Sequence, residues 1–182
     1  HAFDYLLVAL AVTGLVALAG DRRHWRDVTA RRLGGFLALG VAVPALVHAW
    51  RGGALLVLPV GAYVAFGSAS ALRDDASPLR EHAWLLGALA VGAVLAIVPH
   101  VLLDWVGTTR AIAPTLLFAG SLLVVLAAEL AHGKGIDARN ALAAELVVGG
   151  VTGVGSWLFV PVIQDPLKQG IDFFVRTGQS SI

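Results

Sequence analysis

The sequence contains no cysteine. This absence excludes disulfide bonds, zinc–thiolate sites, iron–sulfur clusters and thiol catalysis. Methionine is also absent, even at position 1, so we expect the 182 residues to follow a processed start or residues that are not seen. The formal net charge is only +1, which gives no bulk electrostatic attraction toward nucleic acid, and no nucleic-acid partner is expected.

Charged residues are scarce. They make up 14% of the chain, whereas 58% of its residues are hydrophobic and the mean hydropathy is +0.81. A typical soluble domain has about 25% charged and about 45–50% apolar residues. So few charges cannot cover a globular surface, so lipid must cover most of it. The composition therefore predicts a multi-pass integral membrane protein of the cell membrane, whose first partner is the lipid bilayer.

Long apolar runs, separated by short polar segments, recur along the chain. A bilayer core of about 30 Å needs about 20 apolar residues per helix. Continuous runs of this length favour helices over the alternating pattern of barrel strands. We predict an all-α transmembrane bundle of six spans in one domain, 1–164, followed by a short interfacial or flexible tail, 165–182. Five spans are the alternative, because the turn between the second and third is very tight. The six expected spans are about 2–20, 33–50, 54–72, 83–106, 111–131 and 141–163.

Positive charge is distributed unevenly between the expected loops. The loops after the first, third and fifth spans hold nine basic residues, and the opposite side holds four. Basic residues are retained in the cytoplasm. This asymmetry predicts that these three loops face the cytoplasm and that both termini lie on the outer side. The basic stretch 21–32 also suits contact with acidic lipid headgroups.

The last expected span is rich in glycine. Gly149 and Gly153 have the spacing of a GxxxG motif, and small residues let helices approach closely in lipid. Packing within the chain is one explanation. The other is that this span contacts other membrane subunits or a second copy of the chain, which are the protein partners we expect.

The stretch "AIVPHVLLDW", 96–105, places His100 and Asp104 four residues apart on one helix face. Pro99 precedes them and leaves a carbonyl group one turn back without its amide partner. Ionisable side chains at membrane depth are costly and indicate function. We therefore predict a polar pocket in the outer leaflet, formed by His100 and Asp104 with His48 and Arg110 nearby.

This predicted pocket has several uses. It suits a proton relay or a solute site, or two of the ligands of a divalent metal ion. His48 and His100 are also candidates for the two axial ligands of a haem iron. The alternative without function is that His100 and Asp104 pair with each other and with Arg110 at the membrane interface.

A second candidate cluster lies near the cytoplasmic side. Glu129 and His132 are three residues apart at the end of the fifth span, and Glu145 lies one turn into the sixth. Glu-x-x-His is the spacing of carboxylate di-metal bundles, although those sites use two such motifs. Ordinary helix-end electrostatics are the alternative, since His132 lies near a helix C-terminus and Glu145 in a first turn, where the helix dipole favours each of them.

Two classes of function follow from these patterns. The first is a membrane-embedded subunit or transport component whose His/Asp pocket handles a proton, ion, small solute or cofactor; a bis-His haem-binding anchor subunit is a variant of it. The second is a metal-dependent membrane enzyme acting on a lipid or isoprenoid, with a divalent metal held by one of the two clusters. The sequence leaves open whether the protein is an enzyme.

Overall fold

All the regular secondary structure is helical in the part of the chain that the computed structural model describes, residues 2–19, 26–49, 57–103, 108–144 and 146–147. Five helices are followed by the beginning of a sixth, which covers 138–144 and 146–147. The all-α prediction is confirmed for these residues. The five helices are α1 (Ala2–Ala19), α2 (Ala30–Ala49), α3 (Val57–Arg73), α4 (Pro78–Leu103) and α5 (Thr108–Gly133).

Three of these helices have segments long and apolar enough to cross a membrane: Ala30–His48 in α2, Pro78–Leu102 in α4 and Ile112–Gly133 in α5. The apolar helix Phe3–Ala19 is shorter, and α3 has 17 residues. A helix of 17 residues is about 26 Å long, a little less than a bilayer core of about 30 Å. The described residues thus hold three candidate spans, and a total of six spans stays a prediction.

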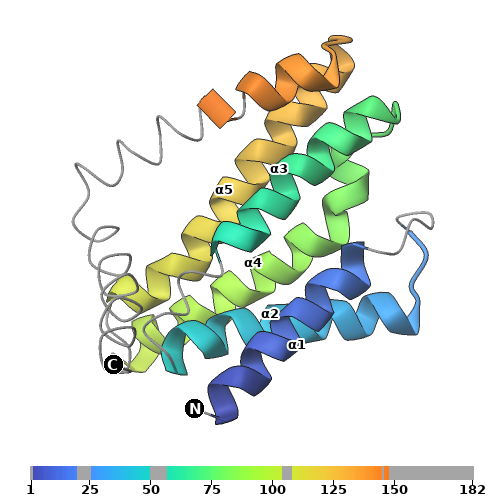
Figure 1. The fold of residues 1–182 in the computed structure, drawn as a ribbon. Helices are drawn as coiled ribbons and strands as arrows, with labels where there is room; N and C mark the ends of the chain where they lie inside the picture. Colours follow the sequence, from blue (N-terminus) through green and yellow to red (C-terminus); the bar gives the residue numbers. More distant parts are fainter. Residues whose placement is uncertain (1, 20–25, 50–56, 104–107, 145, 148–182) are drawn as a thin grey trace, which may run out of the picture.

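Helix α4 is the centre of the bundle. It packs extensively against α5 and α2, and less extensively against α3. Helix α1 packs mainly on α2, so it lies at one edge of the molecule, and α3 packs mainly on α5 (Figure 1). The helices enclose a buried core of aliphatic side chains to which all five contribute, among them Ala11, Leu39, Val64, Leu89 and Val125.

Glycines bring α1 and α2 into close contact. A Cβ atom added at Gly14 would lie 2.8 Å from the amide nitrogen of Leu39 and 2.9 Å from the carbonyl oxygen of Gly35. A Cβ atom added at Gly35 would lie 3.0 Å from the carbonyl oxygen of Gly14. The two backbones therefore touch at this crossing. Close backbone contact is how helices associate in lipid, where no hydrophobic force drives them together.

The α2–α4 crossing uses a proline and two glycines. Pro44 has no amide hydrogen, so the carbonyl oxygen of Gly40 lacks its partner within α2. This oxygen would lie 3.2 Å from a Cβ atom at Gly92 of α4. The absence of a side chain at Gly92 thus lets the backbone of α4 come close to this oxygen. Pro44 thus frees the carbonyl oxygen of Gly40, and Gly92 leaves room for that oxygen beside α4.

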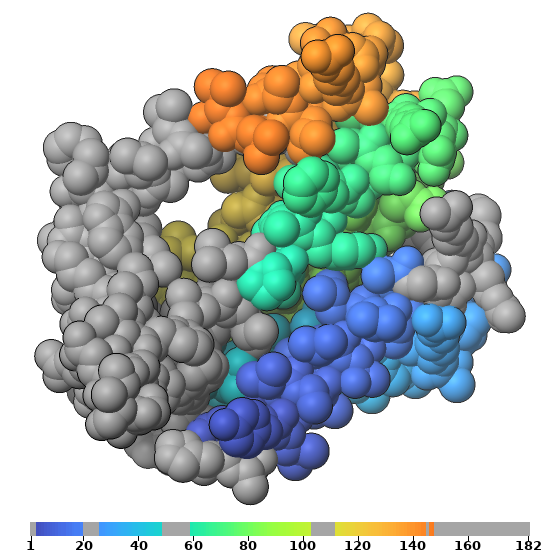
Figure 2. Space-filling view, in the orientation of Figure 1, coloured from blue at the N-terminus to red at the C-terminus, as the bar shows by residue number. Residues whose placement is uncertain are grey.

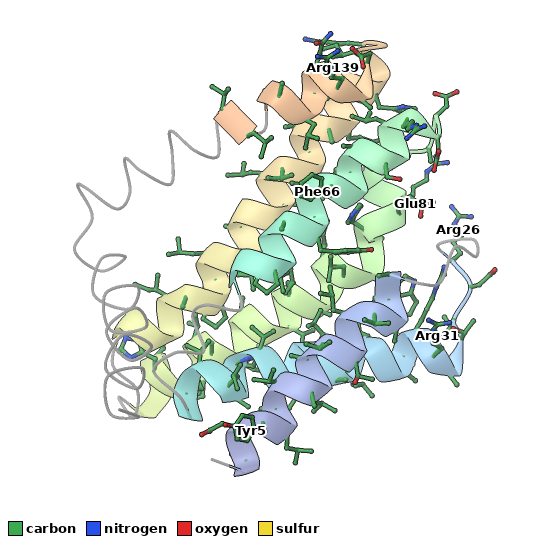
Figure 3. The ribbon with its side chains drawn as sticks, viewed as in Figure 1. Tyr5, Arg26, Arg31, Phe66, Glu81 and Arg139 are labelled. Carbon is green, nitrogen blue, oxygen red and sulfur yellow. The ribbon has the colours of Figure 1, made fainter. Side chains whose placement is uncertain are left out.

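The outer face of the bundle is apolar. Phe66, in the middle of α3, is 61% exposed, and Leu123 of α5 is 68% exposed. Figure 3 shows Phe66 on the surface of the bundle, far from the charged side chains of the turns. Soluble proteins rarely expose large apolar side chains along several helices. This surface supports a membrane environment for the described helices.

Two turns of the chain have the same backbone geometry. After α3, Asp75 adopts φ 53°, and after α5, Gly135 adopts φ 66°. The amide of Ala76 donates to the carbonyl of Ala71 at 2.8 Å, and the amide of Ile136 to that of Ala131 at 2.9 Å. This pattern is a Schellman motif, which ends a helix with a left-handed residue. The two turns stand next to each other at the top of the bundle, in green and orange (Figure 2).

Basic residues gather at this end, which we call the turn end. Arg26, Arg31 and Arg139 lie there, whereas Tyr5 lies at the opposite end (Figure 3). Arg32 is buried at 4% exposure, and its guanidinium donates to the carbonyl of Asp27 at 3.1 Å. Helices α1, α3 and α5 end here and α2 and α4 begin here, because consecutive helices run in opposite directions (Figure 1).

Candidate functional site

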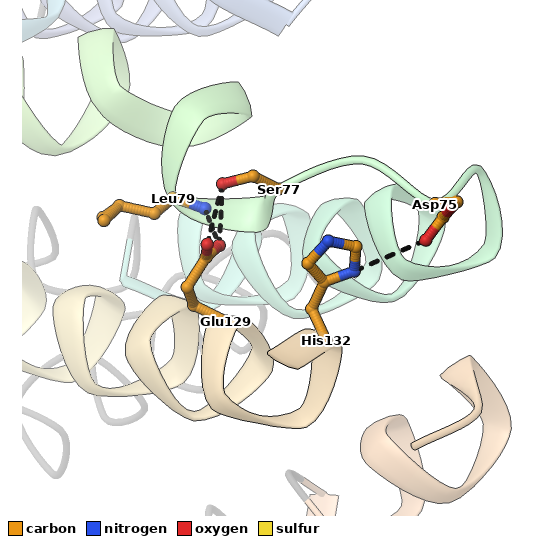
Figure 4. Close-up of polar contacts among 5 residues, drawn as sticks. All are labelled: Asp75, Ser77, Leu79, Glu129 and His132. Atoms are coloured by element: carbon orange, nitrogen blue, oxygen red, sulfur yellow. Dashed lines mark hydrogen bonds and ion pairs between the residues drawn. The ribbon is translucent and has the colours of Figure 1, made fainter. Parts of the chain in front are cut away.

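Glu129, from the second cluster predicted, binds the start of a neighbouring helix. Its carboxylate accepts the hydroxyl of Ser77 at 2.9 and 2.8 Å and the amide of Leu79 at 3.0 Å (Figure 4). Ser77 is also the N-cap of α4, because its hydroxyl accepts the amide of Arg80 at 3.3 Å. A carboxylate at a helix N-terminus meets free amides and the positive end of the helix dipole. Glu129 therefore fastens α5 to the α3–α4 turn.

His132 contacts the same turn. Its Nδ1 lies 3.8 Å from Oδ1 of Asp75, whose side chain is 99% exposed (Figure 4). An exposed pair at this distance adds little to stability. Glu145, the third residue of this predicted cluster, lies outside the described residues. The partners that the structure gives to Glu129 and His132 thus come from the α3–α4 turn.

Of the residues predicted for the outer pocket, His48 and His100 lie at the other end of the bundle, where α2 and α4 end. His48 is in the last turn of α2, and His100 is in the last turn of α4. Both ring nitrogens of His48 are buried, and His100 is half-buried. Asp104 and the side chain of Arg110 lie outside the part that the structure describes, as does the Gly149–Gly153 pair.

The packing of α2 against α4 relates the two histidines. Phe36 packs edge-to-face on Trp84, with ring centroids 5.9 Å apart, and Gly40 lies beside the carbonyl of Ala88. The two helices are therefore parallel and in a constant register. Continued by two turns, this register brings His48 level with Ala96, one helical turn before His100. The sequence predicted a common depth for these residues, and the register adds that their helices are direct neighbours.

A metal site is not assembled within the described residues. Among them, no group of three or more His, Cys, Asp or Glu side chains has the geometry to hold a metal ion. His48 and His100 supply two imidazoles at one end, and Glu129 and His132 occupy the other. Any fuller ligand set would need side chains such as Asp104 or Glu145, which are not described.

Three buried polar residues of the described part were missed in the sequence: His82, Ser68 and Ser121, of which Ser121 of α5 is 4% exposed. His82 of α4 is 3% exposed, and Ser68 of α3 is fully buried. A signal for His82 exists, because it shares the spacing of the buried Leu85, Leu86 and Leu89 and so belongs to the inner face of α4. A similar signal exists for Ser68, which follows Val60 and Val64 at intervals of four residues.

Comparison with known proteins identifies no relative. No family model matches the chain, and neither a curated protein nor a solved structure matches it. The fold and the apolar surface therefore define only a class. The chain is an all-α protein with three described helices that are able, by length and composition, to cross a membrane.

Proposed function

We propose that this chain is a small multi-pass integral membrane protein that acts as a membrane-embedded subunit or transport component. Its working site is a polar pocket at the ends of α2 and α4, which handles a proton, an ion, a small solute or a cofactor. His48, His100, Asp104 and Arg110 form this pocket. In this proposal the bundle has six spans and the turn end faces the cytoplasm, because basic residues gather there.

One observation carries the proposal. His48 and His100 lie in the last turns of α2 and α4, two neighbouring helices that run in the same direction. Ionisable side chains at membrane depth are costly and indicate function. Two histidines that end neighbouring helices at one end of the bundle support a shared ligand there.

The test is purification of the whole chain in a mild detergent, with His48→Ala and His100→Ala as variants. His132→Ala is the matched control, because it removes an imidazole from the turn end. We expect a partner subunit or a bound small molecule to accompany the wild-type protein and the control, and to be lost at least tenfold from both pocket variants. A single species without partner or ligand, unchanged by either variant, would contradict the proposal.

A second variant set separates a working pocket from a tolerated ion pair. Replacing both His100 and Asp104 by Leu removes two polar groups without changing the helical character of α4. If His100 and Asp104 only form an ion pair with each other, the double variant keeps its function and unfolds at a higher temperature. Apolar residues often replace buried ion pairs without loss of stability. Our proposal requires loss of function in a protein that still folds and inserts.

The packing of α2 against α4 supports one specific cofactor variant, a haem held by His48 and His100. Haem proteins use axial imidazoles contributed by neighbouring helices. The observation that supports it is the pair of histidines in the last turns of two parallel, adjacent helices. A Soret band in the purified protein that disappears in both His48→Ala and His100→Ala would support this variant. A purified protein without a Soret band, from cells supplied with haem, would rule out the haem-binding variant.

A further inference from the structure

A second set of buried polar atoms belongs to α3 and α4, away from the helix ends that carry His48 and His100. His82 lies one turn into α4 and is 3% exposed, and Ser68 on α3 is fully buried. Nε2 of His82 and Oγ of Ser68 have no hydrogen-bond partner among the described residues. A buried polar atom without a partner costs about 1–3 kcal/mol, so two of them need an explanation.

One hydrogen bond fixes the tautomer of His82. Its Nδ1 lies 2.9 Å from the carbonyl oxygen of Pro78. A carbonyl oxygen only accepts, so Nδ1 carries the proton and donates. In the neutral ring Nε2 is then a bare acceptor. The hydroxyl of Ser68 both donates and accepts. The two groups are thus complementary to a molecule that donates one hydrogen bond and accepts another.

Gly67, the residue before Ser68 in α3, has no side chain and so leaves room for the imidazole of His82. A Cβ atom at Gly67 would lie 2.7 Å from Nε2 of His82, so the ring rests directly on the backbone of α3. One turn earlier on the same helix, the ring of Tyr63 is tilted against the imidazole, with centroids 6.0 Å apart. The nitrogen therefore points at α3 within a polar and aromatic surrounding.

Interior water in proteins typically satisfies two to four buried polar groups that have no other partner. In a helix bundle surrounded by lipid, such water is found where polar groups face the interior.

We propose that His82 and Ser68 form a binding site for a water molecule at the α3–α4 interface. The water donates a hydrogen bond to Nε2 of His82 and accepts one from the hydroxyl of Ser68. The N-terminus of α4, where Glu129 binds Ser77, belongs to the turn end. His82 lies one helical turn further along α4, so the site lies one turn inside this end. This water site is separate from the pocket proposed at His48 and His100.

A double-mutant cycle on thermal unfolding tests the shared ligand. The variants are His82→Phe, which keeps a ring, Ser68→Ala, and both together, all measured in the same micelles. If one water joins the two side chains, each single variant lowers the midpoint, and the double variant lowers it no further than the larger single effect. The control pairs His82→Phe with Ser70→Ala, an exposed serine of α3, and these two effects should add.

Additive effects of His82→Phe and Ser68→Ala would overturn the site. A rise of the midpoint in both single variants would overturn it as well, because removal of dry, unpaired polar atoms stabilises a core.

Nitrogen NMR of the imidazole keeps the test valid if His82→Phe does not fold. We expect His82 to be protonated on Nδ1, with an Nε2 resonance typical of an acceptor that receives a hydrogen bond. In Ser68→Ala this resonance should move toward that of a free acceptor. A proton on Nε2 alone, or a resonance that Ser68→Ala leaves unchanged, would contradict the proposal.

Discussion

At the residue scale, two adjacent glycines of α2 have very different surroundings. A Cβ atom at Gly35 would lie 3.0 Å from both the carbonyl oxygen of Gly14 and the Cβ of Ala17, whereas a Cβ atom at Gly34 would meet nothing within 4 Å. A backbone oxygen cannot rotate away, so a methyl group at Gly35 must push α1 and α2 apart. Overpacking of this kind costs about 1–3 kcal/mol.

We therefore predict that Gly35→Ala lowers the midpoint of thermal unfolding in micelles by several degrees. Gly34→Ala should leave it unchanged or raise it slightly, since alanine favours helix over glycine. Equal effects of the two substitutions would show that α1 does not pack on α2 as described.

A second residue-scale prediction concerns Glu129. Glu129→Ala removes an acceptor from Ser77 and from the amide of Leu79, so we expect a loss of about 1 kcal/mol, the usual contribution of a helix cap. Glu129→Gln keeps one oxygen acceptor and should lose less. The measurements are the free energy of unfolding in micelles and the hydrogen exchange of the Leu79 amide, which should become faster.

The control for Glu129 is Glu81→Ala. Glu81 is exposed in the first turn of the same helix, so this variant removes the same charge near the same N-terminus without any of these hydrogen bonds. If Glu81→Ala destabilises the protein as much as Glu129→Ala, charge alone explains the effect and the contact with Ser77 does not.

Individual residues show where sequence reasoning stopped. Glu129 and His132 were recognised as a pair by their spacing, but their partners, Ser77 and Asp75, lie more than 50 positions away in the chain. Such partners depend on how α5 packs against the α3–α4 turn, and no local pattern contains that information. His82 was overlooked for another reason, because its place on the inner face of α4 is visible only when the helix is known to begin at Pro78.

At the scale of elements, the turn after α3 carries a strained residue. Asp75 occupies the left-handed region at φ 53°, where the equivalent position after α5 is a glycine. A residue other than glycine costs roughly 1–2 kcal/mol in that region, somewhat less for Asp. Its pair with His132 is exposed and 3.8 Å long, so the pair is worth less than this strain.

We thus predict that Asp75→Gly stabilises the protein by about 0.5–1 kcal/mol although it deletes the contact with His132. Denaturant unfolding in micelles measures the change. The matched variant is Gly135→Asp, which should destabilise by a similar amount because it places a side chain in the same conformation. A destabilised Asp75→Gly would mean that the contact with His132 outweighs the backbone strain.

The helices themselves were largely visible in the sequence. The apolar runs gave five of the described helices to within a few residues at most ends, because a run long enough to cross lipid has few alternatives to a helix. The largest difference is at α4, which was expected at 83 and begins at Pro78. The capping residues Ser77 and Pro78 extend the helix into a polar segment, "RDDASPLREH", whose composition resembles a loop.

At the scale of the whole molecule, the arrangement combines an apolar outer face with charged turns gathered at one end. Phe66 and Leu123 face outward at mid-helix, and Arg26, Arg31 and Arg139 share the turn end. These two features are what a bundle in a bilayer requires. The packing order of the helices, with α4 at the centre, was not predictable, because every apolar run has the same composition and any of them would suit the core.

The absence of cysteine makes the topology directly measurable. Single cysteines replace Asp74 or Lys134 in the turns, or Phe3 at the start of α1, in an otherwise cysteine-free chain. All three positions are exposed, so none needs unfolding to react. A membrane-impermeant maleimide applied to intact cells then reports which end of the bundle is outside.

The central claim is a membrane bundle whose turn end faces the cytoplasm. It predicts that intact cells label Phe3→Cys, whereas Asp74→Cys and Lys134→Cys react only after the membrane is made permeable, with all three proteins in the membrane fraction. Labelling of Asp74→Cys and Lys134→Cys in intact cells, with Phe3→Cys protected, would contradict the orientation, and recovery of the protein without membranes would contradict the bundle's place in the bilayer.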